Sequence, residues 1–329
     1  MAKKQVGKQT IRFLHPPVIQ GAASVVGKKE GEGPYGEWFD CIEKDPKMGG
    51  DSWEEAEGKF QEKAAKLAIE HAGLQQKEIR YIVAGDLLGQ LMASSFGLLS
   101  LQIPLFGVYG ACSTMGESMG IAAMIVEGGF ADHVLALTSS HFASAEKQFR
   151  FPLGYGNQRP KASTWTATGS GAVVISKSVL EEEKESHKIG QNYSKEALKE
   201  KGKVHIEGIT TGKVIDFGIK DSMNMGACMA PAAADTLYRH FKDFNTTPED
   251  YDKIITGDLG IVGKTILMDL LREKGYDISK KHMDCGVEMF DGSSQDTHAG
   301  GSGCGCAAVT LSAYILPKLA SGEWKRVLF

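Results

Sequence analysis

The sequence predicts an α/β fold made of two related halves, and three observations support this. Strand-like and helix-like segments alternate along the chain with short connections, which is typical of a parallel or mixed sheet covered by helices. The pattern I-(V/I)-x-G-D-L occurs twice, at strand ends marked by Asp86 and Asp258, which lie 172 residues apart. A strongly charged stretch, residues 181–203, separates the two copies. We therefore predict a duplication with halves at 1–180 and 181–329.

The first half contains a regular series of predicted elements. A strand-like piece at 11–25 is followed by a Gly/Lys/Glu-rich segment that we expect to be an exposed loop. Ser52 and Glu55 have the capping-box spacing, and apolar residues recur at helical spacing until Gly73. The remaining predictions are a strand at 79–86, an apolar helix at 90–102, a strand at 105–110, a helix after Cys112, a strand at 133–140 and a strand at 170–178.

The second half restarts in the same order. Residues 230–244 have helical periodicity, and a polar lead then enters a strand that ends at Asp258. An apolar helix, a turn and a Gly-rich helix start follow, as they do after Asp86. The two aspartates should therefore occupy equivalent strand ends.

Composition excludes several classes of protein. The 329 residues include 37 Lys and Arg against 41 Asp and Glu, a net charge of −4 that gives no general attraction to nucleic acid or anionic lipid. The six cysteines form no CxxC pair, so reduced thiols are expected rather than a zinc site. The N-terminal lysines precede no apolar core, so we expect no signal peptide.

One uncharged stretch is long enough to cross a bilayer. It covers the 30 residues from Leu87 to Gly116. Polar residues, Pro104 and several glycines interrupt it, which indicates turns and strand ends rather than one apolar helix. We predict no transmembrane segment and expect this stretch to be buried in the fold.

Cys112 is the first candidate for chemistry, because it lies between a strand end and a helix start. Unpaired N–H groups and the positive end of the helix macrodipole stabilise a thiolate and bind anions at such a position. We therefore expect a lowered pKa for Cys112. Glycines at 107, 110 and 116 allow close approach of the backbone. The alternative is an inert cysteine that fills the core.

Three segments resemble the thiolase and ketoacyl synthase superfamily. ACSTMGESMG, from residue 111, resembles its active-site cysteine segment; GSGAVVIS resembles the later core strand, and HAGGSGCGCAAVTLSAYIL the closing loop and helix. The resemblance implies two duplicated halves, each with a mixed sheet and helices, in an α/β/α/β/α arrangement. It also implies a homodimer that pairs through the uncharged segment 87–105.

The catalytic pattern of that superfamily is incomplete here. Its condensing members use a cysteine nucleophile with a His and an Asn or second His from the second half. Cys112 matches the nucleophile, but Asp258 stands where an imidazole is expected, and the closing loop carries His298. An ionised carboxylate cannot donate to an oxyanion and opposes a thiolate. Arg159 and Trp165 match no coenzyme A motif. We predict a degenerate site; the alternative is an acyltransferase or condensing enzyme using Cys112 on an acyl-coenzyme A thioester.

Longer segments resemble the stage V sporulation protein AD family of endospore-forming bacteria. They are MGGDSWEEAE, GVYGACSTMGES, TSSHFASAEKQFRFP, QRPKASTWTATGSGA and HAGGSGCGC. The resemblance implies a protein that binds dipicolinic acid and takes part in its uptake into the developing spore. It also implies membrane partners from the same operon and a peripheral location at the inner spore membrane.

The residues can be assigned to such a ligand only as candidates. Dipicolinate is a small planar dianion, often held as a calcium chelate. The helix start after Cys112 could receive one carboxylate, and His141 or His298 could donate to the other or stack on the ring. Asp86 or Asp258 could contact calcium brought with the ligand. The alternative roles are local: a hydrogen-bonded strand-end histidine, and aspartates that cap turns. No other cofactor is expected.

Overall fold

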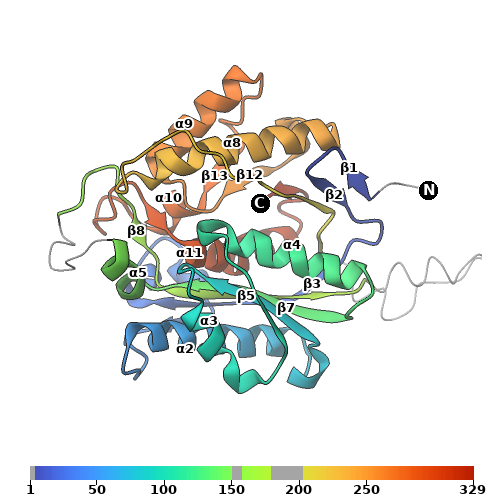
Figure 1. Cartoon of the computed structure of the whole chain (residues 1–329), viewed down its shortest axis with the longest axis vertical. Coiled ribbons are helices and arrows are strands. Elements are labelled where there is room, and N and C mark those ends of the chain that lie inside the picture. Colours follow the sequence, from blue (N-terminus) through green and yellow to red (C-terminus); the bar gives the residue numbers. More distant parts are fainter. Residues whose placement is uncertain (1–3, 150–157, 179–202) are drawn as a thin grey trace, which may run out of the picture.

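The computed structural model describes residues 4–149, 158–178 and 203–329, which form five layers in the order α/β/α/β/α (Figure 1). The outer helices of the first half and of the second half enclose two sheets, and two helices lie between the sheets. The predicted fold class is thus confirmed. From the first-half side, the helical layers are α2 (Trp53–His71) with α3 (Met92–Gly97), α4 (Thr114–Glu127) with α11 (Cys304–Thr310), and α8 (Met225–Phe244) with α9 (Gly260–Glu273).

The larger sheet has seven strands and is mixed. Strand β5 (Tyr81–Asp86) pairs in parallel with β6 (Leu105–Gly107) on one side and with β7 (His133–Ser140) on the other. Strand β9 (Gly169–Ser176) is antiparallel to both β7 and β3 (Val18–Gly27). The path ends at β6 on one edge; at the other, β3 pairs with β10 (Val204–His205) and with β4 (Cys41–Glu43).

Alternation of side chains explains why these strands are apolar throughout. Val83 and Val134 face the central helical layer, whereas Ile82 and Leu135 face α2. Successive residues of a strand point to opposite faces, and here both faces are covered. The larger sheet therefore carries a hydrophobic cluster on each side.

The smaller sheet belongs to the second half. Strand β12 (Lys253–Thr256) lies between β13 (His282–Asp284) and β15 (Val327–Leu328), and all three are parallel. Ile254 packs among α8 and α9, and Ile255 packs toward the central helical layer. The order α8–β12–α9 matches the order α2–β5–α3. The predicted boundary at 180/181 and most of the charged stretch lie outside the described residues.

The shorter elements connect these layers. The N-terminal strands form an antiparallel sheet with a strand of the second half, and a two-stranded parallel ladder joins β8 to the closing loop. They are β1 (Gln5–Val6), β2 (Thr10–Arg12), β11 (Gly208–Thr210), β8 (Trp165–Thr166), β14 (Gly301–Ser302), α1 (Lys28–Gly31), α5 (Phe142–Phe149), α10 (Cys285–Met289), the π-helical turn η7 (Leu311–Ile315), α12 (Leu316–Ala320), and the short helices η1 (Gly36–Trp38), η2 (Gln76–Glu78), η3 (Leu99–Leu101), η4 (Ala111–Ser113) and η6 (Pro248–Asp250).

The predicted helix start at Ser52 is confirmed. The Ser52 hydroxyl accepts a hydrogen bond from the Glu55 N–H at 3.1 Å, so one of the free donors of the first turn is satisfied. Gly73, with φ of 70°, follows the helix and lets the chain reverse toward β5.

Three sequence predictions are wrong in part. The apolar helix at 90–102 is split into α3 and η3, because Gly97 lies against the backbone of Gly58 and the chain turns there. The Gly/Lys/Glu-rich segment contains α1, whose Glu30 is buried. The uncharged stretch is not wholly buried, since Phe96, Leu99 and Phe106 are exposed. Among the described residues, no helix is long and apolar enough to cross a membrane.

Candidate ligand-binding site around Cys112

The turn before α4 positions Cys112. The chain leaves β6 and enters η4, where Ala111 adopts a φ of 49°, unusual for a residue with a side chain. The Thr114 hydroxyl donates to the Ala111 carbonyl at 2.7 Å and accepts from the Gly110 N–H at 3.2 Å. These bonds hold Cys112 at the start of α4, as predicted, where it is half-buried against Leu87 and Cys304.

The second half brings Asp258 to this cysteine. The Asp258 carboxylate accepts the Gly303 N–H at 2.7 Å, and it lies close enough to the Cys112 thiol for its charge to act on the thiol. Gly303 has a φ of 96°, and a Cβ there would lie 2.8 Å from the Ser140 hydroxyl oxygen. Glycine is required at this position both by the backbone conformation and by the close approach.

The predicted lowering of the Cys112 pKa is wrong. Burial, followed by the charge of Asp258 and the hydrogen bond to it, raises the pKa of Cys112 well above its ordinary value. Burial also raises the pKa of Asp258, although the hydrogen bonds from Cys112 and Gly303 oppose this. The helix macrodipole corresponds to only about half a charge at each end, so burial and a neighbouring carboxylate outweigh it. At neutral pH Cys112 is a thiol.

Two polar residues of the site were not predicted. The Ser302 hydroxyl lies 3.5 Å from the Asp258 carboxylate. Asp284 accepts from the Leu259 N–H at 2.9 Å and from the Thr256 hydroxyl at 2.6 Å, and thereby fixes the turn that carries Asp258. Burial raises the pKa of Asp284 to about 6. Ser302 stands directly before Gly303 in the glycine-rich motif, and this position in the sequence could have indicated that Ser302 belongs to the site.

Asp86 occupies the strand end of the first half and caps its turn. Its carboxylate accepts the Ser94 N–H at 3.0 Å, the Ser94 hydroxyl at 2.8 Å and the Leu88 N–H at 3.3 Å. With Glu54 and Glu57 it lines a cavity of about 150 Å³. These contacts agree with the turn-capping alternative for Asp86.

His141 is held by the backbone on both sides of its ring. Nδ1 accepts from the Ala143 N–H at 3.1 Å, so Nε2 carries the proton and donates to the Pro46 carbonyl at 2.8 Å. Burial lowers the pKa of His141, and the ring packs against Trp53. The described contacts correspond to the strand-end alternative.

His298 lies in the loop that precedes β14, with a φ of 53°. Its Nδ1 lies 2.9 Å from the Pro160 carbonyl oxygen, and its Nε2 lies 3.1 Å from the Asp296 carboxylate. The predicted candidates therefore separate: Cys112 and Asp258 meet, whereas His141, His298 and Asp86 each have other partners.

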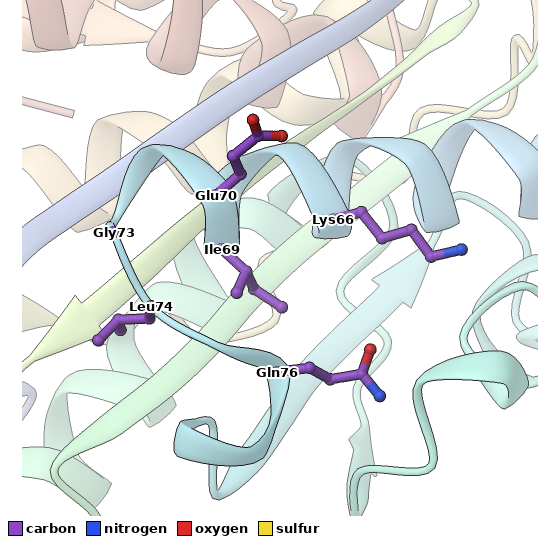
Figure 2. A pocket seen from close by; sticks show the side chains of 6 residues that line it. All are labelled: Lys66, Ile69, Glu70, Gly73, Leu74 and Gln76. Carbon is purple, nitrogen blue, oxygen red and sulfur yellow. The ribbon is translucent and has the colours of Figure 1, made fainter.

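A second hollow, of about 350 Å³, lies on the outer layer at the end of α2. Figure 2 shows the residues around it, which come from α2, the loop that follows and the first residue of η2. No predicted site residue is among them; its lining residues are Lys66, Ile69, Glu70, Gly73, Leu74 and Gln76. Within the ranges that the structure describes, no group of three or more His, Cys, Asp or Glu residues is arranged to hold a metal ion.

Comparison with known proteins decides the family. The family model for stage V sporulation protein AD (SpoVAD) matches residues 7–329. The chain belongs to the SpoVAD family. Stage V sporulation protein AD of Bacillus subtilis (strain 168) is 43% identical over 324 residues, which cover 98% of this chain and 89% of the relative. The resemblance to this family is thus confirmed, and with it a place among sporulation proteins.

Several solved structures of other proteins have the same fold as this SpoVAD-family chain. An OleA variant from Xanthomonas campestris superposes with a TM-score of 0.55 at 14% identity, covering 94% of this chain and 92% of that one. 3-Oxoacyl-acyl-carrier-protein synthase III from Aquifex aeolicus VF5 gives a TM-score of 0.51 at 15% identity, covering 93% and 92%. The priming β-ketosynthase of the R1128 polyketide pathway gives a TM-score of 0.52 at 14% sequence identity, and the superposition covers 94% of this chain and 88% of that one. These likenesses confirm the thiolase-like fold.

Proposed function

We propose that this SpoVAD-family protein binds dipicolinic acid at the Cys112 site and takes part in its uptake into the developing spore. The observation that carries the proposal is the place of Cys112 at the start of α4 beside the Asp258 carboxylate, where burial and the charge of Asp258 raise the pKa of the thiol. A protonated thiol is a poor nucleophile toward a thioester, because the thiolate is the reactive form. The site thus keeps a helix start that suits an anion, and the raised pKa of Cys112 argues against its use as a nucleophile.

The charges of the site favour the calcium chelate over the free dianion. One ligand carboxylate can approach the N-terminal end of α4, beside Cys112, where the positive end of the helix macrodipole attracts an anion. Asp258, however, is a nearby carboxylate that repels a free dianion. Calcium prefers oxygen ligands, so a chelated ion facing Asp258 would turn this repulsion into attraction. No resident metal cofactor is proposed.

An enzyme remains the alternative. Cys112 stands at the start of a helix in a ketosynthase-like fold, so an acyltransferase or condensing reaction on an acyl-coenzyme A thioester is a distinct candidate. Such a reaction requires a covalent acyl group on Cys112. Intact mass measurement after incubation with acyl-coenzyme A would detect that adduct.

The exposed edge of the larger sheet supports a homodimer as part of the proposal. Strand β6 ends the sheet, and apolar side chains cluster on it and on the segments beside it; they include Phe96, Leu99, Phe106 and Tyr109. Unpaired strand edges next to apolar surface are suited to pairing with another strand. We further propose that the protein acts peripherally at the inner spore membrane, with membrane proteins of the same operon as partners.

Calorimetric titration of dipicolinate, with and without calcium, tests the binding function. We expect saturable binding to the unmodified protein, tighter with calcium. Cys112→Trp should abolish binding because the side chain fills the site, whereas Cys112→Ala should weaken it only modestly because the N–H groups remain. The proposal fails if dipicolinate gives no saturable signal while acyl-coenzyme A forms an adduct on Cys112.

A further inference from the structure

Arg159 is a buried cation with incomplete hydrogen bonding. Its side chain is only 2% exposed. One terminal nitrogen, Nη2, donates to the Asp296 carbonyl at 2.7 Å and to the Asp296 carboxylate at 2.9 Å. Its Nε and Nη1 are buried and have no hydrogen-bond partner in the described part of the chain. Burying a charged donor without an acceptor is costly, so these two nitrogens indicate a missing acceptor.

A second cation lies beside Arg159. The ring of Trp165 has the Lys29 ammonium 4.2 Å and the Arg159 guanidinium 5.0 Å from its centroid. Phe142 stacks on the same ring with centroids 3.9 Å apart. Lys29 donates to the Gln295 carbonyl, which fixes the ammonium to the loop that carries Asp296. Both cations therefore have defined positions on rigid neighbours.

The loop supplies a third unsatisfied group. Thr297 is 1% exposed, and its hydroxyl has no hydrogen-bond partner among the residues described. It directly follows Asp296, whose carbonyl binds Arg159. A hydroxyl can donate or accept, whereas the N–H groups on the two guanidinium nitrogens can only donate. An acceptor that reached both residues would satisfy the hydroxyl and the guanidinium together.

The local charge defines the kind of acceptor. Lys29 and Arg159 carry two positive charges, and Asp296 supplies one negative charge while being 74% exposed. Glu30 and Glu32 are also near Lys29. Burial raises the pKa of Glu30 to about 7, so it is partly protonated at neutral pH, and Glu32 is paired with Lys28 at 3.6 Å. The unbalanced charge is thus at most one unit. That matches a carboxylate better than a phosphate, which carries nearly two charges at neutral pH.

We propose that Arg159, Lys29 and Thr297 form a carboxylate-binding site beside Trp165. This site goes beyond the function proposed above, because it does not depend on Cys112. It is linked to the Cys112 site through a strand pair, because β8, which contains Trp165, pairs with β14, which contains Ser302. His298 belongs to it as a positioning residue, because it holds the Asp296 carboxylate that orients Arg159.

Thermal unfolding with sodium acetate as the probe tests this site. Acetate should raise the unfolding temperature of the unmodified protein in a saturable way relative to sodium chloride of equal ionic strength. Arg159→Gln should weaken the apparent acetate affinity at least about tenfold, which corresponds to 1.4 kcal/mol. Thr297→Val, which keeps the arginine, should weaken it several-fold and serves if the arginine variant does not fold. Arg272→Gln is the matched control, because Arg272 is exposed and pairs with Asp269 on one helix.

Dipicolinate added to Cys112→Trp identifies the source of the carboxylate. An Arg159-dependent stabilisation in that variant supports the site and assigns it a carboxylate of dipicolinate. Stabilisation by acetate but not by dipicolinate supports the site and assigns it a monocarboxylate instead. The inference is overturned if acetate does not stabilise the unmodified protein. It is also overturned if acetate stabilises Arg159→Gln and Thr297→Val as strongly as it stabilises the unmodified protein. Because Cys112→Trp disables only the first site, failure of one proposal is distinguishable from failure of the other.

Discussion

The Asp258 carboxylate beside Cys112 sets the chemistry of the site at the scale of single residues. Asp258→Asn removes the carboxylate that raises the pKa of Cys112. The pKa should fall, although burial will keep it above the ordinary value, and alkylation of Cys112 by iodoacetamide at pH 8 should become about tenfold faster. Peptide mass mapping over time measures this rate.

Cys228 provides the internal control for that experiment, because it is exposed and remote in sequence from the substitution. Its alkylation rate should not change. An unchanged rate at Cys112 would contradict the role given to Asp258.

Sequence reasoning reached the identity of these residues but not their chemistry. The strand-end position of Asp258 and the helix-start position of Cys112 follow from local patterns, and the structure brings the two together. The sign of the pKa change depends on burial and on a carboxylate 146 residues away in the chain, which no local pattern shows. His141 was not assigned its partner because that partner is a backbone carbonyl, at Pro46, distant in sequence.

At the scale of elements, α11 lies so close to the larger sheet that β9 requires a glycine. A Cβ at Gly171 would lie 2.3 Å from the Ala308 carbonyl oxygen. Gly171→Ala should therefore destabilise the protein by about 3 kcal/mol, because the helix must shift. Gly116→Ala in α4 is the matched control. A Cβ there meets nothing within 4 Å, and we expect the free energy of unfolding to rise by about 0.5–1 kcal/mol. Urea denaturation measures both; equal effects would contradict the close packing.

The buried carboxyl of Glu57 ties α2 to β7 and α5. It accepts from the Ser139 hydroxyl at 2.8 Å and from the Ser144 hydroxyl at 2.6 Å. Burial, with Asp86 nearby, raises its pKa from 4.5 to about 8. The folded state thus holds a proton that the unfolded chain releases, so stability falls as pH rises from about 4.5 to about 8.

Glu57→Gln should remove the part of this dependence on pH that Glu57 contributes, whereas Glu30 and Asp284, whose pKa values burial also raises, should keep theirs. The variant should gain stability relative to the unmodified protein as pH approaches 8, by an amount on the order of a few kcal/mol. Denaturation at pH 5 and pH 8 measures the change. Glu70→Gln, at an exposed position of the same helix, should leave the slope unchanged. A slope in Glu57→Gln as steep as that of the unmodified protein would contradict the assignment.

Element prediction succeeded where a segment had a single environment. Strands β5 and β7 were found because both faces are buried, and α2 because it has a cap and one apolar face. The prediction that the segment from 87 to 116 is buried failed, because apolar composition cannot distinguish a buried face from an exposed apolar edge. The break between α3 and η3 depends on the contact between Gly97 and Gly58, which is tertiary.

At the scale of the whole molecule, the apolar edge at β6 predicts a dimer. Phe106→Asp places a charge on this edge, where the phenylalanine is 48% exposed. The variant should be monomeric by light scattering, whereas the unmodified protein should be a dimer. Phe217→Asp, at a 65% exposed position before α8, is the control and should remain dimeric. A monomeric unmodified protein would contradict the proposal.

The five-layer architecture was predictable because the resemblance covered nearly the whole chain and because the element order repeats around Asp86 and Asp258. The convergence of the two halves at one site was not readable from either half alone. It depends on α11 and the glycine-rich loop of the second half packing against β7 and β9 of the first. This packing places Gly303, and with it Asp258, beside Cys112.

A crystal structure of the protein with calcium dipicolinate is the most direct test of the central claim, that Cys112 and Asp258 form a binding site rather than a catalytic one. We predict electron density for the ligand at the start of α4, with one carboxylate toward the helix N–H groups, calcium toward Asp258, and Cys112 unmodified. Ligand density remote from Cys112, or an acyl group covalently attached to its sulfur, would contradict the account.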